Sequence, residues 1–378
     1  MTITRDPGPT AAGTGTGTGR DGGAAPLPRP QRRIRGMTRE DVGVLAGCGL
    51  SSFTLIWLIF ARLSDGAGWL GFLVAWYAAF LVMLYVVTWE RRGRLAAADQ
   101  VAGTVIRTGM LMLVLPLGWL LAFVALEGVP TLRLTFFTTD QTGVTPDMPA
   151  TAGGALHSIV GTLEQVGMAL IWAVPLSVLT AIYLNETRSR LRRPLRILVD
   201  AMSGLPSIVA GLFIYAALII PLEGALFNFN GLMASLALSI IMLPTVTRTI
   251  EVVLRLVPQG LREASLALGA SRARTVWSVV LPTARTGVTT AVVLGIARTV
   301  GETAPLLYTS FGLDLFNANP LAEPQDSLPL FVYSNVQKPS AAAAERGFAG
   351  AVVLIGVVLG LFALARYVGR DRSRRRSR

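Results

Sequence analysis

Long apolar segments recur along this chain, and they limit its fold more than any other feature. Each spans about 18 residues or more with few charged side chains, which is the length that an α-helix needs to cross a bilayer. Of the 378 residues, 15% are charged, against about 25% in soluble domains. We therefore expect an all-α, polytopic transmembrane helical bundle of about eight spans. The predicted spans lie near residues 42–61, 69–88, 109–126, 156–184, 205–222, 232–249, 287–309 and 348–367.

Arginine-rich segments alternate with loops that carry few arginines. The arginines gather before the first predicted span, after the second, fourth and sixth spans, and at the C-terminus. Because basic loops stay in the cytoplasm, this alternation predicts a multi-pass protein with both termini cytoplasmic. The net charge of +12 is thereby explained by membrane orientation, and we expect the lipid bilayer, not nucleic acid, as its partner.

Composition divides the chain into four parts. Residues 1–40 are rich in Gly, Thr and Pro and are predicted to be a disordered cytoplasmic tail. Residues 41–107 form a predicted transmembrane hairpin followed by a basic loop. The main membrane domain covers residues 108–368, and residues 369–378 form a basic cytoplasmic tail.

A polar segment, Gln259 to Leu281, separates the sixth and seventh predicted spans. It has helical periodicity, but it holds too many polar groups to enter the bilayer. We expect a short helix that ends at Gly269, which permits a tight reversal, and a second helix from Ser271 that stops at Pro282. An ordinary amphipathic interfacial helix is the alternative. The basic side chains expected to face a protein partner are Arg262, Arg272 and Arg274.

Two charged residues occur inside the seventh predicted span. Arg298 and Glu302 are four residues apart, so on a continuous helix they would share a face and pair. A single charge at the bilayer centre costs ~3 kcal/mol on insertion scales, so such residues pair, face water or serve a function. An arginine guanidinium suits a tetrahedral oxyanion. The alternative is a purely structural ion pair between helices.

Another arginine, Arg248, lies near the cytoplasmic end of the sixth predicted span, with Glu251 about one turn further on. Arg248 is a second candidate for contact with an anion. The alternative is that its side chain only anchors the helix at the membrane surface.

The polar segment between these spans resembles the EAA loop of ABC importer permeases. The matching residues are Glu263, Ala264, Gly269, Val279, Leu281 and Pro282. Serine at 265 and valine at 279 stand where alanine and isoleucine are usual. The resemblance implies that residues 251–282 form a coupling loop, to which Arg272 also belongs, that docks on an ATP-binding subunit.

No GxxxxGK[ST] phosphate loop occurs in the chain. The resemblance therefore implies that ATP and Mg²⁺ are bound and hydrolysed by separate subunits. We expect no cofactor in this chain, and a transporter subunit in place of an enzyme.

Three further motifs, GLPSIVAGLFIY, LPTVTRTIEVVLRLVP and ARTVGETAPLLYTSFG, are similar to the PstA-type phosphate ABC permeases. The similarity covers residues 111 to 367. It implies a type I importer (MetI-like) permease core in a bacterial cytoplasmic membrane, with a substrate path at Arg248, Arg298 and Glu302 and a hydroxyl at Thr303. That family has about six spans, so the hairpin at residues 41–107 would be an addition of unknown role.

The same resemblance implies several partners. These are a second permease of the PstC type, a dimer of PstB-type ATP-binding subunits, a PstS-type extracytoplasmic phosphate-binding protein, and a possible sensor kinase with its regulator. Two alternatives stay open: a permease for sulfate, molybdate or phosphonate, and a non-transporting scaffold that senses phosphate.

The side chains that usually form metal sites are scarce. The chain has one histidine, His157, and one cysteine, Cys48. Neither can form a metal site by itself, so we expect none. His157 begins the fourth predicted span, and we expect it to cap that helix or to face water.

Overall fold

The computed structural model describes residues 39–63, 68–187, 189–222, 224 and 228–368. The two predicted tails therefore lie outside the described residues, apart from Arg39 and Glu40, which begin the first helix. Throughout the described part the regular structure is helical, except for one bridge between Phe311 and Gln325. The chain forms two compact units, residues 1–112 and 113–378, and we describe each by itself.

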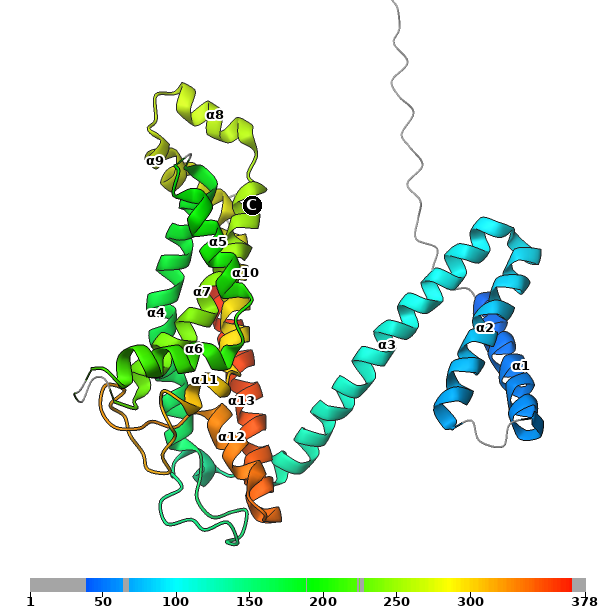
Figure 1. The fold of residues 1–378 in the computed structure, drawn as a ribbon, viewed down its shortest axis with the longest axis horizontal. Coiled ribbons are helices and arrows are strands. Elements are labelled where there is room, and N and C mark those ends of the chain that lie inside the picture. The colour runs from blue at the N-terminus through cyan, green and yellow to red at the C-terminus, as the bar shows by residue number, and fades with distance from the viewer. Residues whose placement is uncertain (1–38, 64–67, 188, 223, 225–227, 369–378) are drawn as a thin grey trace, which may run out of the picture. The chain divides into compact units, whose positions relative to one another are not determined.

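The first unit contains the predicted N-terminal hairpin. Helix α1 (Arg39–Leu63) and helix α2 (Trp69–Arg92) lie antiparallel (Figure 1). Phe53 meets the rings of Phe72 and Trp76 edge to face at 5.5 and 5.7 Å. Arg92 pairs with Asp41 at 2.6 Å and joins the ends of the two helices.

Helix α3 (Arg94–Gly128) runs from the first unit into the second. The sequence predicted a basic loop before a span at residues 109–126, but the helix begins at Arg94. The physical reason is local, because the segment after Arg94 is rich in good helix formers and contains no proline before Pro116.

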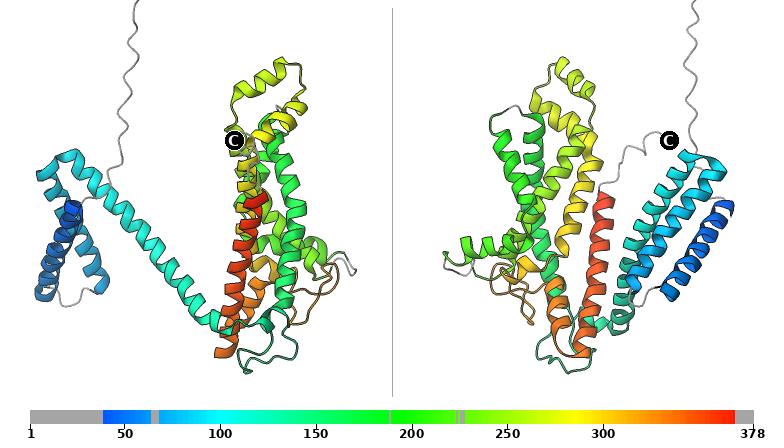
Figure 2. Two further views of the ribbon diagram at one scale, coloured as in Figure 1. Left: turned by 180° about the vertical axis from the view of Figure 1, so that it is seen from behind. Right: turned by 45° about the vertical axis from the view of Figure 1, so that its right-hand side comes forward.

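Four long helices form the core of the second unit: α4 (Leu156–Glu186), α7 (Gly231–Arg255), α10 (Leu281–Val300) and α13 (Ala341–Val368). Helices α4 and α7 pack along each other (Figure 2). Helix α10 approaches α7 so closely at Gly295 that a Cβ there would lie 2.4 Å from a methyl group of Val246. The buried residues at the contact of α4, α7 and α10 are Ala173, Ala181, Met242, Val246, Ile250, Leu254, Ala284 and Ala291.

The second unit has two ends with different structures. At one, which we call the coupling end, lie the C-terminal ends of α4 and α7 with the short helices α8 (Gln259–Ala267) and α9 (Arg272–Thr275) (Figures 1 and 2). At the opposite end lie the 3₁₀ helices η1 (Val129–Thr131) and η2 (Leu134–Phe137) and helix α12 (Leu328–Gln337). Helix α13 runs toward the coupling end. The arginine pattern predicts this, because it places the C-terminus on the same side of the membrane as the segment after the sixth span.

The fifth predicted span, near residues 205–222, is preceded by a helix that the sequence analysis did not expect, and the chain bends sharply between the two. Helix α5 (Arg192–Ser203) is followed by α6 (Ser207–Ile214) and a π turn, η3 (Tyr215–Ile219), and the two parts are bent by 108°. Pro206 has an extended backbone, with φ −57° and ψ 138°, which prevents one helix from continuing through it. The described residues thus include seven helices long and apolar enough to cross a membrane, or eight if the bent pair counts as one span.

Candidate functional site

Arg298 lies in the last turn of α10, and its side chain is exposed. Among the described residues it has no ion-pair or hydrogen-bond partner. A guanidinium on a membrane-spanning helix therefore keeps its five N–H donors available. A small recess surrounds it, lined by residues of the α5–α6 bend and of α7: Met202, Leu205, Pro206, Ala210, Ile240 and Ile241.

The predicted pair between Arg298 and Glu302 is absent from the described structure, and this corrects the sequence analysis. Helix α10 ends at Val300, and Glu302 lies in the turn before the short helix α11 (Ala304–Leu307). The cause is Pro305, whose ring would clash with the carbonyl four residues earlier if the helix continued. Because the two residues no longer share a helix, their spacing of four brings no contact.

The break between α10 and α11 packs directly on the bent element. A Cβ at Gly211 of α6 would lie 2.6 Å from the carbonyl oxygen of Pro305. Thr303 forms the N-cap of α11 through its backbone, and its half-buried side chain makes no capping hydrogen bond. Helix α6 thus contacts the start of α11, directly after the turn that carries Glu302 and Thr303.

Arg248 belongs to a network of ion pairs near the coupling end. Its Nη1 donates to Oε2 of Glu251 at 2.6 Å, and its Nη2 pairs with Asp200 of α5. The side chain of Glu251 is only 2% exposed, and it also binds Arg196 and, at 2.5 Å, Arg255. We call these five residues the Glu251 network. Carboxylates therefore hold the Arg248 side chain in place. Its role is not limited to anchoring the helix at the membrane surface.

Helix α5 is the part of the site that sequence reasoning missed, because its residues were interpreted as an arginine-rich loop. A signal was present: Arg192, Arg196 and Asp200 recur every four residues, which places them on one helical face. The α5–α6 element contacts Arg248 through Asp200, and its bend lines the same small recess as Arg298. The structure thus brings both predicted arginines to one element.

The polar segment that was predicted to be a coupling loop forms α8 and α9. Gly269 has a φ of +82°, which is the reversal that the sequence predicted. No residue of α8 is buried, and the side chains of Glu263, Ala264 and Arg272 are exposed. Ser265 and Thr275 hold the two helices together through a hydrogen bond of 2.9 Å. The loop thus presents nearly its whole first helix to solvent.

The expected stop at Pro282 is wrong. Residues Arg272–Val300 form one helix, in which a π turn, η5 (Val276–Val280), precedes Pro282. Leu281 donates its N–H to the carbonyl of Val276, five residues earlier, and this wider turn accommodates the proline ring. Pro282 stands in the first turn of α10, while Leu281 packs against the core.

Arg262 does not face outward, contrary to expectation. It pairs with Glu186 of α4 at 3.1 Å and donates to the carbonyls of Leu254 and Val257. It therefore anchors the base of α8 to the spans. Beside it lies a polar cavity of about 620 Å³. The charged side chains that line the cavity are Glu186, Arg192, Arg255, Arg262, Glu263 and Arg272.

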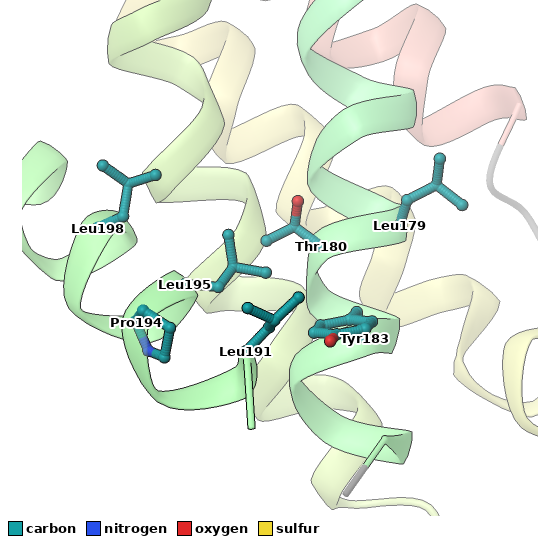
Figure 3. A pocket seen from close by; sticks show the side chains of 7 residues that line it. All are labelled: Leu179, Thr180, Tyr183, Leu191, Pro194, Leu195 and Leu198. Carbon is teal, nitrogen blue, oxygen red and sulfur yellow. The ribbon is translucent and has the colours of Figure 1, made fainter. Parts of the chain in front are cut away.

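A second pocket, of about 610 Å³, lies between α4 and α5 (Figure 3). Its polar side chains are Thr180 and Tyr183, and the rest of its lining is apolar. A pocket without a charged side chain offers nothing to offset the desolvation of an anion, so it does not belong to the candidate anion path. The apolar lining residues are Leu179, Leu191, Pro194, Leu195 and Leu198.

A polar network also lies at the opposite end, and the sequence analysis did not foresee it. His157 is 2% exposed and packs on the ring of Phe331, so it does not face water as expected. Ser158 donates to Asp326 at 2.5 Å. Gln165 donates to Gln325 and to the backbone carbonyl of Asp326, both at 3.2 Å. These contacts fix the segment before α12 to helix α4, and we call them the Asp326 network.

With the geometry described, comparison with known proteins identifies the family. Residues 173–374 match the model of the binding-protein-dependent transport system inner membrane component. The chain belongs to this family. The match begins within α4 and includes the α5–α6 element, the Glu251 network, the coupling loop and Arg298.

Curated relatives extend the similarity toward the N-terminus. The phosphate transport system permease protein PstA 1 of Mycobacterium tuberculosis is 39% identical, over 73% of this chain and 90% of its own. PstA of Pasteurella multocida is 34% identical, over 65% and 85%. The probable PstA of Methanocaldococcus jannaschii is 32% identical, over 69% and 90%. The chain is thus a multi-pass membrane subunit of a transporter.

Proposed function

We propose that this chain is the PstA-type permease subunit of an ATP-driven importer of inorganic phosphate. The observation that carries the proposal is Arg298, an exposed membrane-span arginine without a partner among the described residues, which lines a small recess beside the α5–α6 bend. Its fork of donors matches the oxygens of a tetrahedral anion. The names of the curated relatives support phosphate as that anion.

Arg298 and Arg248 would offer positive charge along the path, and Glu302 and Thr303 would offer an acceptor and a hydroxyl at the turn beyond Arg298. A phosphate oxygen that carries a proton can donate to the carboxylate of Glu302, whereas a fully ionised anion cannot. This supports phosphate over sulfate as the cargo. The residue roles along the path are part of this proposal.

Transport would be driven from outside this chain. The exposed face of α8 and the side chains Glu263 and Arg272 would dock on an ATP-binding subunit, which binds and hydrolyses ATP with Mg²⁺. A second permease would complete the pore, and an extracytoplasmic binding protein would deliver phosphate. The chain itself would have no ATPase site and would lie with both termini in the cytoplasm.

The test is uptake of radiolabelled phosphate in cells whose only copy of the chain carries Arg298→Ala or Glu263→Ala, with membrane levels measured in parallel. We expect both variants to fall to the deletion background. Arg298→Lys keeps the charge but loses the planar fork, so it should retain a fraction of the uptake. The matched control is Arg107→Ala, since Arg107 lies on α3 before the family match begins.

Normal uptake by Arg298→Ala at normal membrane levels would contradict the site. Full uptake in cells whose ATP-binding subunit cannot hydrolyse ATP would contradict the whole function. Competition by unlabelled sulfate, molybdate or phosphonate, added at a hundredfold excess, decides the cargo, and we expect none of them to reduce uptake as unlabelled phosphate does.

A further inference from the structure

Asp200 lies in the last turn of α5, and its carboxylate binds the guanidinium of Arg248. Two carboxylates therefore share this arginine. Glu251 holds the Nη1 side, and Asp200 occupies the Nη2 side. Arg248 thus has both edges of its donor fork engaged by protein carboxylates.

The two carboxylates have different surroundings. The Glu251 side chain is 2% exposed and is bound by three arginines, whereas the Asp200 side chain is 58% exposed and pairs with Arg248 alone. Releasing Glu251 from its arginines would leave a buried carboxylate without compensation. Releasing Asp200 costs far less, because its carboxylate is already largely hydrated. Asp200 is therefore the exchangeable carboxylate.

The charge balance of the Glu251 network also indicates that Asp200 is exchangeable. Three arginines face two carboxylates while Asp200 is bound. When Asp200 leaves, the network has an excess of two positive charges around a buried carboxylate. That excess equals the charge of a divalent oxyanion, and the vacated Nη2 edge can donate to its oxygens.

The position of Asp200 connects this exchange to Arg298. Asp200 lies two residues before Met202, with which the lining of the Arg298 recess begins. Movement of the end of α5 away from α7 would therefore free Arg248 and enlarge the recess at the same time.

We propose that Asp200 is an internal substitute for the transported anion, which occupies Arg248 in the empty state and is displaced by phosphate. The inference rests on the proposed function and adds to it a residue that controls access and affinity. No covalent step is involved, since one oxyanion replaces another on the same guanidinium. Asp200 acts through Arg248 and is thus a positioning residue.

The experiment measures equilibrium binding of radiolabelled inorganic phosphate to the purified, assembled transporter in nanodiscs, without the binding protein. Asp200→Asn removes the competing charge and keeps the side-chain volume. We expect its Kd for phosphate to fall about tenfold, which corresponds to about 1.4 kcal/mol. Asp200→Glu restores a carboxylate, and its Kd should stay within about twofold of the wild-type value.

Two further variants separate competition from a merely structural role. Asp200→Asn combined with Arg248→Gln should show no gain in affinity, because the gain depends on the freed guanidinium. Asp41→Asn is the matched control, since Asp41 also forms an ion pair with an arginine, Arg92 on α2. Its Kd should be unchanged. If Asp200→Asn does not assemble, Asp200→Ser carries the same expectation.

An unchanged or weaker affinity in an assembled Asp200→Asn complex would overturn the proposal. So would an equal gain in the Arg248→Gln background. In both cases, loss of binding in Arg298→Ala would leave the proposed function standing. If the wild-type complex neither binds nor transports phosphate, the proposed function fails as well.

Discussion

The two ends of the second unit bind their buried carboxylates in different ways. At the opposite end, the carboxylate of Asp326 accepts from the hydroxyl of Ser158 and lies 3.4 Å from Nε2 of His157, and no arginine among the described residues pairs with it. At the coupling end, the Glu251 network gathers three arginines around a buried carboxylate. A carboxylate bound by neutral donors carries no surplus positive charge, whereas a network with more arginines than carboxylates can bind a further anion. If both proposals hold, substitutions at the opposite end should change stability alone, whereas substitutions at the coupling end should also change ligand binding.

The largest expected effect comes from breaking the coupling-end network at its centre. Glu251→Gln weakens three charge-assisted hydrogen bonds to a buried acceptor, each worth about 1.5 kcal/mol, so we expect a loss of about 4 kcal/mol in unfolding free energy. The measurement is unfolding of the purified protein by added SDS in mixed micelles. Glu90→Gln, at an exposed position of α2, is the control. A loss below about 1 kcal/mol would mean that the three arginines do not depend on this carboxylate.

The next largest effect tests the opposite end, where Arg346 of α13 is 1% exposed. Its guanidinium donates to four backbone carbonyls at 3.0 to 3.2 Å, those of Thr145, Pro146, Met148 and Pro149. Arg346→Ala leaves these carbonyls unsatisfied, and we expect a loss of about 3 kcal/mol. Phosphate Kd should stay unchanged in the assembled complex. A large change in Kd would remove the contrast between the two ends.

A smaller effect is expected from Ser158→Ala, which deletes the hydrogen bond to Asp326. The cost of one such buried bond is about 1 kcal/mol. The same SDS titration measures it, and Ser158→Thr, which keeps the hydroxyl, should recover part of the loss. If Ser158→Ala lowered phosphate uptake at normal membrane levels, the Asp326 network would have to be assigned to the transport path.

The smallest effect concerns Asp140, in the loop before α4. Partial burial raises the pKa of its carboxyl, but the backbone N–H groups of Thr142 and Phe316 donate to the carboxylate and bring the pKa below its ordinary value. Because the folded-state pKa is depressed, this contribution to stability is present above the unfolded-state pKa and is lost as pH falls through the folded-state pKa. Asp140→Asn should reduce the acid dependence of the thermal midpoint, and an unchanged acid dependence would contradict this.

The sequence predicted the parts of this molecule that depend on local patterns. The length of the apolar segments predicted the spans, and Gly269 predicted the reversal between α8 and α9. Both depend only on neighbouring residues in the sequence. The predicted Arg298–Glu302 pair is wrong because α10 ends at Val300, between the two residues, ahead of Pro305. Spacing predicts a contact only where the helix is continuous.

Contacts between distant segments could not be predicted in this way. Asp200 and Arg248 are 48 residues apart, and Ser158 and Asp326 are 168 apart. Charge periodicity could have predicted α5 as a helix, but not which arginine its carboxylate would bind. Burial of His157 likewise depends on Phe331, which reaches it from another helix.

The unbroken helix from Arg272 to Val300 fixes the rotational phase between the coupling loop and Arg298. Because an α-helix turns about 100° per residue, inserting one residue between them would point the guanidinium to a different side of the bundle. Inserting a whole turn would restore the direction but move Arg298 by about 5 Å along the axis. The length of this segment therefore sets both the direction and the depth at which Arg298 lies relative to the coupling helices.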